Sequence, residues 1–172
     1  FYTVFDIDNG INLLEDFLVD RLSSVGDLPI LLCGDLNGRT SNVFPECYDV
    51  NQLFDPIENT IYSNIKRRSK DQVLNLYGKC LLNMCSSLGL CILNGVCNGD
   101  LQGRYTFISD FGNSVNDYFI ASTDLFEVIR STCFLYVSDH IESQHMPLEL
   151  SLMMGGSSCV ISNIKEREKE FI

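Results

Sequence analysis

The hydrophobic positions near the start of the chain recur every three or four residues, which is the period of a helix. Residues 12–24 are therefore expected to form a helix, with Asp8 or Asn9 as its N-cap and Gly26 just past its end. One face of this helix is predicted to pack into a core, and its apolar side chains are Ile11, Leu14, Leu18 and Leu22.

A longer stretch of the same periodicity covers residues 70–88. Ser69 and Gln72 have the spacing of a capping box, in which a serine hydroxyl and a glutamine amide satisfy the first backbone N–H groups of a helix. Gly89 follows the last apolar position and suits a helix C-terminus. The pattern predicts a helix whose buried face consists of Val73, Leu76, Tyr77, Cys80, Leu81, Met84 and Leu88.

Short apolar runs bounded by polar residues predict the strands. Two of these runs are joined through Asp110-Phe111-Gly112-Asn113, a sequence typical of a tight turn. Helices and strands alternate early and strands dominate later, so the expected fold is a layered α/β or α+β sandwich. The predicted strands lie at residues 30–33, 90–93, 104–109, 115–121, 126–137 and 146–153.

The composition favours one globular domain, because 45% of the 172 residues are hydrophobic and 20% are charged. We expect this domain over residues 1–153 and a charged tail, helical or a linker, over residues 154–172. No apolar run of the sequence reaches the length of a membrane span. The eight cysteines lack the spacing of a zinc site, so reduced thiols in an intracellular protein, nuclear or cytoplasmic, are expected.

The net charge of −11 opposes tight, non-specific binding of nucleic acid by this chain alone. Two features reduce the force of this argument without removing it. A cluster of Lys66, Arg67, Arg68 and Lys70 is locally basic, and Arg104 stands near a predicted turn. A divalent cation held by carboxylates would also reverse the local sign of the charge.

The first candidate site is Gly34-Asp35-Leu36-Asn37-Gly38-Arg39, which follows an apolar run and predicts polar side chains at the C-terminal edge of a strand. Asp35 and Asn37 are two positions apart, so an extended backbone would point both side chains the same way. A carboxylate can orient a water or hold a metal ion, and an amide can stabilise charge on phosphate oxygens. The alternative is an Asx turn capped by its own side chains.

Asp117 lies within an apolar strand, where a charge is costly unless it has a partner. It is either a buried aspartate bonded to backbone amides or to a serine, or a carboxylate that orients a histidine, as in catalytic triads. The chain has two histidines, His140 within Ser138-Asp139-His140 and His145 within Ser143-Gln144-His145-Met146-Pro147.

Taken in order, the Gly34–Arg39 segment, Ser114-x-x-Asp117-Tyr118 and the Ser-x-His-x-Pro element at His145 resemble the motifs of the endonuclease/exonuclease/phosphatase superfamily. More narrowly, the chain resembles the apurinic-type endonuclease domains of LINE-like (non-LTR) retrotransposons. The stretch containing Ser69-x-Asp71-x-x-x-Asn75-x-x-Gly78 and, further on, Arg104-Tyr-Thr-Phe107 is similar to the middle of those domains. The resemblance covers the chain from the first helix to about residue 153.

The resemblance implies a four-layer αββα sandwich of the DNase I type and metal-dependent phosphodiester hydrolysis with Mg²⁺ or Mn²⁺. DNA is the substrate that it implies, and a reverse transcriptase would be linked covalently in the full-length protein. Asp35 would orient or deprotonate the attacking water and is also a candidate metal ligand. Asn37 would support the phosphate oxygens, and Asp117 would pair with the catalytic histidine. Arg68 and Arg104 are candidate contacts to phosphate or DNA.

The family's last motif is Ser-Asp-His followed by any residue and then proline, so Pro147 assigns the catalytic histidine to His145. Asp139 and His140 form the alternative catalytic pair. In this register Gln144 stands where the family has an aspartate that helps to hold the metal. An amide oxygen binds a hard cation without the charge, so we expect metal binding weaker by about 10-fold to 100-fold.

The family's N-terminal half carries an asparagine, a metal-binding glutamate and a tyrosine that are expected to precede this chain's first helix. The chain then corresponds to the C-terminal portion of such a domain, with an apolar sheet face left exposed. We expect the chain alone to be impaired or inactive as a nuclease. Two other hypotheses are a non-catalytic interaction module of the same fold and a phosphatase of small or lipid phosphates.

Overall fold

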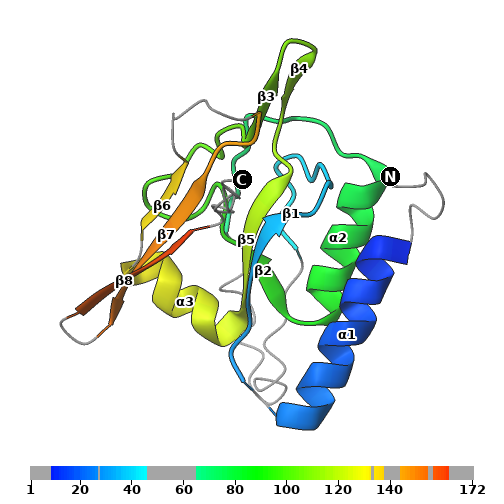
Figure 1. The fold of residues 1–172 in the computed structure, drawn as a ribbon, viewed down its shortest axis with the longest axis vertical. Coiled ribbons are helices and arrows are strands. Elements are labelled where there is room, and N and C mark those ends of the chain that lie inside the picture. The colour runs from blue at the N-terminus through cyan, green and yellow to red at the C-terminus, as the bar shows by residue number, and fades with distance from the viewer. Residues whose placement is uncertain are drawn as a thin grey trace, which may run out of the picture.

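The computed structural model describes residues 9–26, 28–45, 65–132, 134–137, 144–154 and 157–162. It is a mixed α/β fold with antiparallel sheets (Figure 1). Among the described helices none is both long and apolar enough to cross a membrane. The elements are α1 (Asn9–Val25), β1 (Leu31–Asp35), α2 (Leu76–Ser87), β2 (Leu90–Ile92), β3 (Phe107–Ser109), β4 (Gly112–Ser114), β5 (Asp117–Ser122), α3 (Thr123–Thr132), β6 (Phe134–Val137), β7 (Leu148–Met154) and β8 (Ser157–Ser162).

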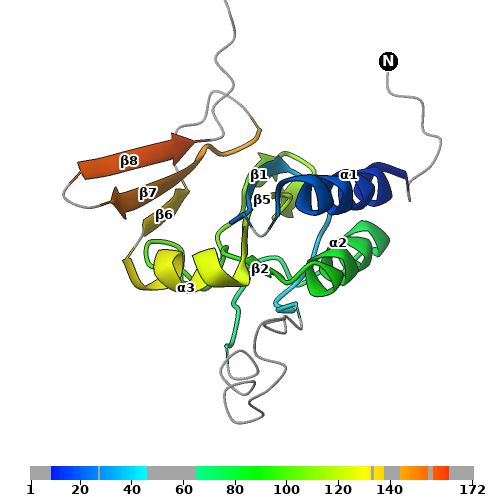
Figure 2. The ribbon, with the colours of Figure 1, turned by 90° about the horizontal axis from the view of Figure 1, so that it is seen from below.

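The strands form two three-stranded sheets and one hairpin. The first sheet has the order β1-β5-β2 and the second the order β6-β7-β8, while β3 and β4 form the hairpin. All of these neighbours pair antiparallel. Figure 2 shows α1 and α2 on one side of the first sheet and the second sheet, with α3, on the other side.

The core lies on both faces of the first sheet, because successive side chains of β5 point to opposite faces. Tyr118 and Ile120 pack with α1 and α2, whereas Phe119 and Ala121 pack with α3 and β7. All four are fully buried. The expectation of an exposed apolar face is therefore wrong for the β1-β5-β2 sheet.

Helix α1 confirms the helix predicted at residues 12–24, but the second helix is shorter than the prediction. It begins at Leu76, and the side chain of Asn75 caps it by accepting a hydrogen bond of 2.7 Å from the Gly78 N–H. Ser69 instead accepts from the N–H of Asp71, in a turn that precedes the helix. The capping box at residues 69–72 is wrong, because the Asp71 carboxylate is bonded to Arg39 and this fixes the segment outside the helix.

The predictions for the later part of the chain are wrong at three places. Residues 115–121 do not continue the hairpin: β4 ends at Ser114, and β5 joins the first sheet. Most of the strand expected at residues 126–137 is helix α3, whose buried Phe126 and Ile129 are three positions apart. Residues 157–162 of the expected charged tail form β8, which pairs along β7. Residues 163–172 lie outside the described part of the chain.

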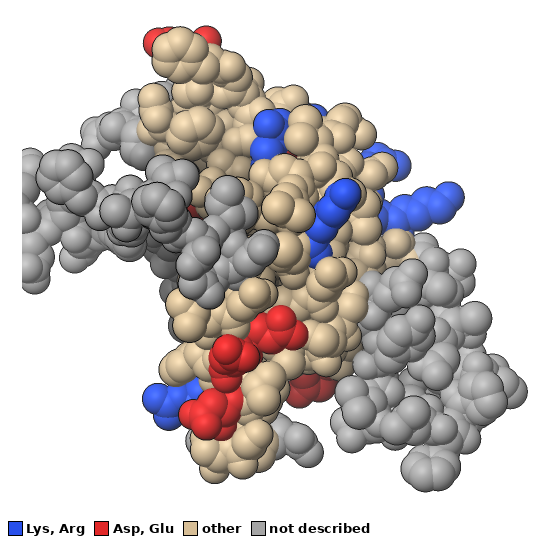
Figure 3. Space-filling model, turned by 90° about the vertical axis from the view of Figure 1, so that its right-hand side faces the viewer, with Lys and Arg blue, Asp and Glu red and all other residues tan. Residues whose placement is uncertain are grey.

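The charges are unevenly distributed over the surface. Figure 3 shows a group of acidic side chains low on the face that carries α1, and several Lys and Arg side chains in its upper half. Helix α1 contributes Glu15, Asp16 and Asp20. The net negative charge therefore does not exclude a locally basic surface.

Candidate active site

The pairing of β1 with β5 places two predicted site residues side by side. Asp35 is the last residue of β1, and its partner in the register is Asp117, the first residue of β5. The Asp117 side chain is 3% exposed and the Asp35 side chain 45% exposed. The sheet edge therefore carries one buried and one accessible carboxylate.

His145 reaches this edge because its segment adds to the start of the β3 strand. The Ile108 N–H donates to the Gln144 carbonyl at 2.8 Å, and the Met146 N–H donates to the Thr106 carbonyl at 2.7 Å. The His145 ring packs edge-on against Phe107, with 4.9 Å between the ring centroids. Backbone pairing and ring packing together hold the imidazole in place.

The imidazole of His145 lies between the two carboxylates. Its Nδ1 is 3.0 Å from Oδ2 and 3.2 Å from Oδ1 of Asp117, and its Nε2 is 3.9 Å from Oδ2 of Asp35. A carboxylate at Nδ1 favours the tautomer with the proton there and stabilises the charged ring. Nε2 is the ring nitrogen on the side of Asp35, and the His145 side chain is 40% exposed.

Asp117 is held from both its backbone and its side chain. Its N–H donates to the Thr106 hydroxyl oxygen at 3.0 Å, and its carboxylate contacts His145. Burial raises the pKa of Asp117, the hydrogen bond from His145 opposes that rise, and the nearby charge of Asp35 adds to it.

The loop after β1 shows the Asx turn that the sequence left as an alternative. Oδ1 of Asp35 accepts a hydrogen bond of 2.9 Å from the Asn37 N–H. Asn37 has a φ of 51°, in the left-handed region that asparagine tolerates better than most residues. The strand does not extend to Asn37, so the argument that an extended backbone points both side chains the same way is wrong. Asn37 is exposed.

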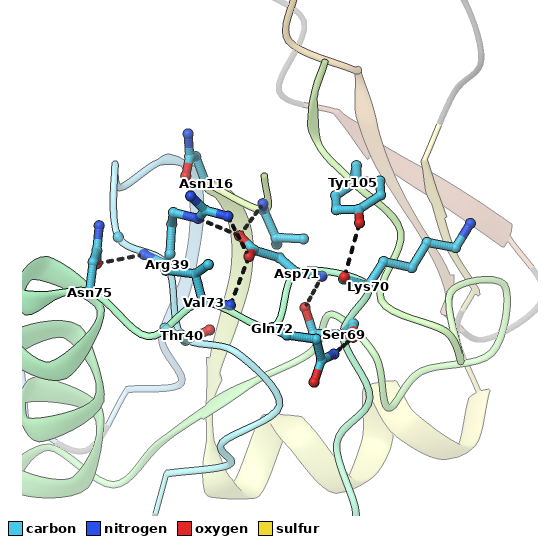
Figure 4. Close-up of polar contacts among 12 residues, drawn as sticks. Arg39, Thr40, Ser69, Lys70, Asp71, Gln72, Val73, Asn75, Tyr105 and Asn116 are labelled. Carbon is cyan, nitrogen blue, oxygen red and sulfur yellow. Dashed lines mark hydrogen bonds and ion pairs between the residues drawn. The ribbon is translucent and has the colours of Figure 1, made fainter. Parts of the chain in front are cut away.

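An ion pair between partly exposed Arg39 and buried Asp71 braces this loop against the start of β5 (Figure 4). Nε and Nη2 of Arg39 each donate to the Asp71 carboxylate at 2.7 Å, and the same carboxylate accepts from the N–H groups of Val73 at 3.0 Å and Val115 at 3.1 Å. Burial opposes ionisation of Asp71, but the bonds from Arg39 and the two amides lower its pKa below the ordinary value. Asp71 thus joins the segments that carry Asp35 and Asp117.

Tyr118 adds a second brace in the same region. Its buried hydroxyl is 2.6 Å from the Gly38 carbonyl and 2.7 Å from the Val115 carbonyl, and it donates to one of them. Sequence reasoning did not assign a site role to Thr106, Asp71 or Tyr118. All three residues belong to the sequence motifs on which the family resemblance rests, and this was the signal that could have identified them.

A divalent cation has few ligands among the described side chains. No group of three or more His, Cys, Asp or Glu residues that could hold a metal occurs in the described part of the chain. Oδ2 of Asp35 offers one accessible carboxylate oxygen, and Gln144 is exposed and offers an amide. Mg²⁺ is often bound by one or two carboxylates, with water and substrate phosphates completing its shell. The described residues at this site therefore offer a cation the exposed carboxylate of Asp35 and the amide of Gln144.

The contacts described for Arg104 and Arg68 lie away from His145. Arg104 bonds its own loop, through its N–H to Asp100 at 2.9 Å and its Nη2 to the Gly99 carbonyl at 2.9 Å. Arg68 is exposed and lines a separate depression. The alternative pair Asp139 and His140 lies outside the described residues.

Comparisons of the chain with protein-family models, curated proteins and solved structures found no match.

Proposed function

We propose that the chain carries a metal-dependent phosphodiester-hydrolysing site of the retrotransposon endonuclease type, which nicks DNA weakly. The observation that carries this proposal is the order Asp117–His145–Asp35, with 3.0 Å from Asp117 to Nδ1 and 3.9 Å from Nε2 to Asp35. A buried carboxylate behind a histidine and an accessible carboxylate in front of it suit acid–base work on a phosphate ester.

The residues divide the chemistry as follows. Asp35 orients a water and accepts its proton as the water oxygen forms a bond to phosphorus and the P–O ester bond breaks. Nε2–H of charged His145 donates a hydrogen bond to a phosphate oxygen, and Asp117 stabilises that charge at Nδ1. Asn37 is the candidate donor to a second phosphate oxygen. A bound Mg²⁺ or Mn²⁺ would neutralise part of the phosphate charge.

The arrangement of the elements supports the same family assignment. A helical layer of α1 and α2 covers the first sheet, and the second sheet lies beyond it (Figure 2). These are three layers in the order expected for an αββα sandwich of the DNase I type, which we propose for the complete domain. DNA as substrate and a linked reverse transcriptase are parts of the same proposal.

A plasmid-nicking assay tests this proposal directly. The wild-type chain is incubated with supercoiled plasmid in Mg²⁺, in Mn²⁺ and in EDTA, beside Asp35→Ala. Asp110→Ala is the matched control, because Asp110 is an exposed carboxylate in the turn between β3 and β4. We expect metal-dependent nicking that is lost in Asp35→Ala and kept in Asp110→Ala. Nicking that survives in Asp35→Ala, or none from folded wild type, would overturn the proposal.

One observation favours a second candidate, a non-catalytic interaction module of the same fold. The described residues contain no group of three or more His, Cys, Asp or Glu that could hold a metal, and Gln144 is neutral, so a cation would be held by little protein charge. A folded wild-type chain without activity in either metal would support this second function.

A further inference from the structure

A depression of about 340 Å³ lies beside the segment that precedes α2. None of Asp35, Asp117 and His145 lines it, so it is distinct from the candidate active site. The residues that line it are Asn42, Arg67, Arg68, Ser69, Lys70, Gln72 and Gln102.

The lining of this depression selects for an anion. It contains three cationic side chains and no carboxylate, although the chain has 23 acidic and 12 basic residues. The other four lining side chains are neutral hydrogen-bonding groups. Cationic and neutral hydrogen-bonding side chains without a carboxylate favour an anionic ligand.

The backbone that presents the basic side chains is clamped in place. The Arg68 N–H donates to the Gly95 carbonyl at 3.2 Å and the Lys70 N–H to the Gly103 carbonyl at 2.8 Å. A Cβ at Gly95 would lie 1.8 Å from the Arg68 carbonyl oxygen, and one at Gly103 would lie 2.3 Å from it. Such close approach is open only to glycine, so a bound anion meets a preformed segment.

Arg67 adds a buried positive charge beneath this segment. The residue is 4% exposed, and its Nε and Nη1 donate to neutral oxygens of Asn94, Thr40, Ser41 and Val43. Its Nη2 has no hydrogen-bond partner among the described residues, and the guanidinium carbon is 5.8 Å from the Tyr118 ring centroid. Buried polar groups of this kind are normally paired, so Arg67 leaves an unsatisfied donor and a positive charge beneath the depression.

The depression and the candidate active site meet at neighbouring residues. The Tyr105 hydroxyl donates to the Lys70 carbonyl at 3.0 Å (Figure 4). The next residue, Thr106, accepts from the N–H of Asp117 at 3.0 Å. One short segment therefore contacts both places.

We propose that this depression binds a backbone phosphate of a polynucleotide, at a position other than the bond that is cut. The identity of the anion rests on the proposed function. A polynucleotide strand presents a phosphate about every 3.4 Å along the helix axis, so one strand can supply phosphates to both places. Arg68 and Lys70 neutralise the phosphate charge, and Asn42 and Gln102 offer amide donors.

The test is binding without cleavage. A fluorescein-labelled duplex oligonucleotide is titrated with the chain in EDTA, by anisotropy, at several salt concentrations. Arg68→Gln/Lys70→Gln is compared with Lys66→Gln/Lys79→Gln, which removes two exposed charges that do not line the depression. We expect the slope of log affinity against log salt to fall by about 2 in the first variant and hardly to change in the second. Thermal melting confirms that both variants are folded.

The outcomes separate this inference from the proposed function. If the salt slope falls equally in the two double variants, or falls in neither, the proposed phosphate site is wrong. A stabilising effect of inorganic phosphate alone, with no oligonucleotide bound, would overturn its assignment to a polynucleotide. Binding that depends on Arg68 and Lys70 supports the site even if plasmid is not nicked. If plasmid is nicked but oligonucleotide binding does not depend on Arg68 and Lys70, the proposed function is supported and the phosphate site is rejected.

Discussion

Asp35 and Asp117 are direct partners in the antiparallel pairing of β1 and β5, so two carboxylates stand opposite each other at one edge of the sheet. Like charges in such a position are unfavourable. His145 lies between them, with Nε2 3.9 Å from Asp35 and Nδ1 3.0 Å from Asp117. A buried carboxylate that contacts a partly exposed histidine is an arrangement expected of a functional site.

The first prediction concerns the Asp117–His145 contact. Asp117→Asn removes the charge that stabilises the imidazolium, and we expect any metal-dependent nicking to fall by about 10²-fold to 10⁴-fold. Asp110→Asn, in the exposed hairpin turn, is the control and should keep the wild-type rate. Single-turnover nicking with saturating protein measures the effect, and an unchanged rate in Asp117→Asn would remove His145 from the proposed mechanism.

The second prediction uses the raised pKa of Asp117, whose first cause is burial, with the Asp35 charge adding to it and the His145 bond opposing it. An unfolded aspartate has a pKa of about 3.9, so the folded state retains this proton to higher pH than the unfolded state does. The stability that the protonated group contributes is complete below the unfolded pKa and is lost as pH rises through the folded one. Urea unfolding should show the stability of wild type relative to Asp117→Asn falling with pH in this window, whereas parallel curves would contradict the coupling.

The third prediction has the opposite sign and concerns Asp71. Its lowered pKa means that its stabilising contribution is present above the unfolded value of about 3.9 and is lost as pH falls through the folded value. Asp71→Asn breaks the pair with partly exposed Arg39 and should cost about 3 kcal/mol of unfolding free energy near neutral pH. At acid pH, the unfolding free energy of Asp71→Asn should also change less with pH than that of wild type.

Asp16→Asn is the control for Asp71→Asn, because Asp16 is exposed on α1. Its stability should stay within about 0.5 kcal/mol of wild type. Equal losses in the two variants would show that the ion pair does not brace the loop.

The fourth prediction tests the close approach of α2 to the loop after β1. A Cβ at Gly78 would lie 1.9 Å from the carbonyl oxygen of Arg39, whereas a Cβ at Gly10 meets nothing within 4 Å. Gly78→Ala should therefore lower the unfolding free energy by about 3 kcal/mol, since backbone cannot move aside as a side chain can. Gly10→Ala, within α1, should raise it by about 0.5 kcal/mol. A neutral Gly78→Ala would show that the loop is not held against α2.

The fifth prediction concerns the weak metal site. Gln144→Asp adds a carboxylate next to His145 and should lower the Mg²⁺ concentration for half-maximal nicking by about 10-fold to 100-fold. Asn12→Asp adds the same charge at an exposed position of α1 and should leave the metal dependence of nicking unchanged. If Gln144→Asp has no effect, the assignment of His145 to the family motif is wrong.

The local pattern of the sequence predicted those helices and strands whose determining residues lie close together in the chain. The helical period located α1, and Gly89 with a φ of 63° follows α2 as predicted. The pattern failed where a distant partner overruled it. Ser69 and Gln72 have capping-box spacing, yet the Asp71–Arg39 ion pair fixes this segment outside the helix. A short apolar run indicated a strand where α3 forms, because packing against the sheet overrides such a weak local preference.

The sequence by itself determined the chemical groups of the candidate site and their order along the chain, with Asp35, Asp117 and His145 each in a polar interruption of an apolar run. Only the tertiary structure decided that these groups meet. The register of β1 on β5 places the two carboxylates opposite each other. The pairing of the His145 segment with the start of β3 places the imidazole between them. Such contacts join residues far apart in the chain. Their register depends on the packing of the whole core, and no local pattern encodes it.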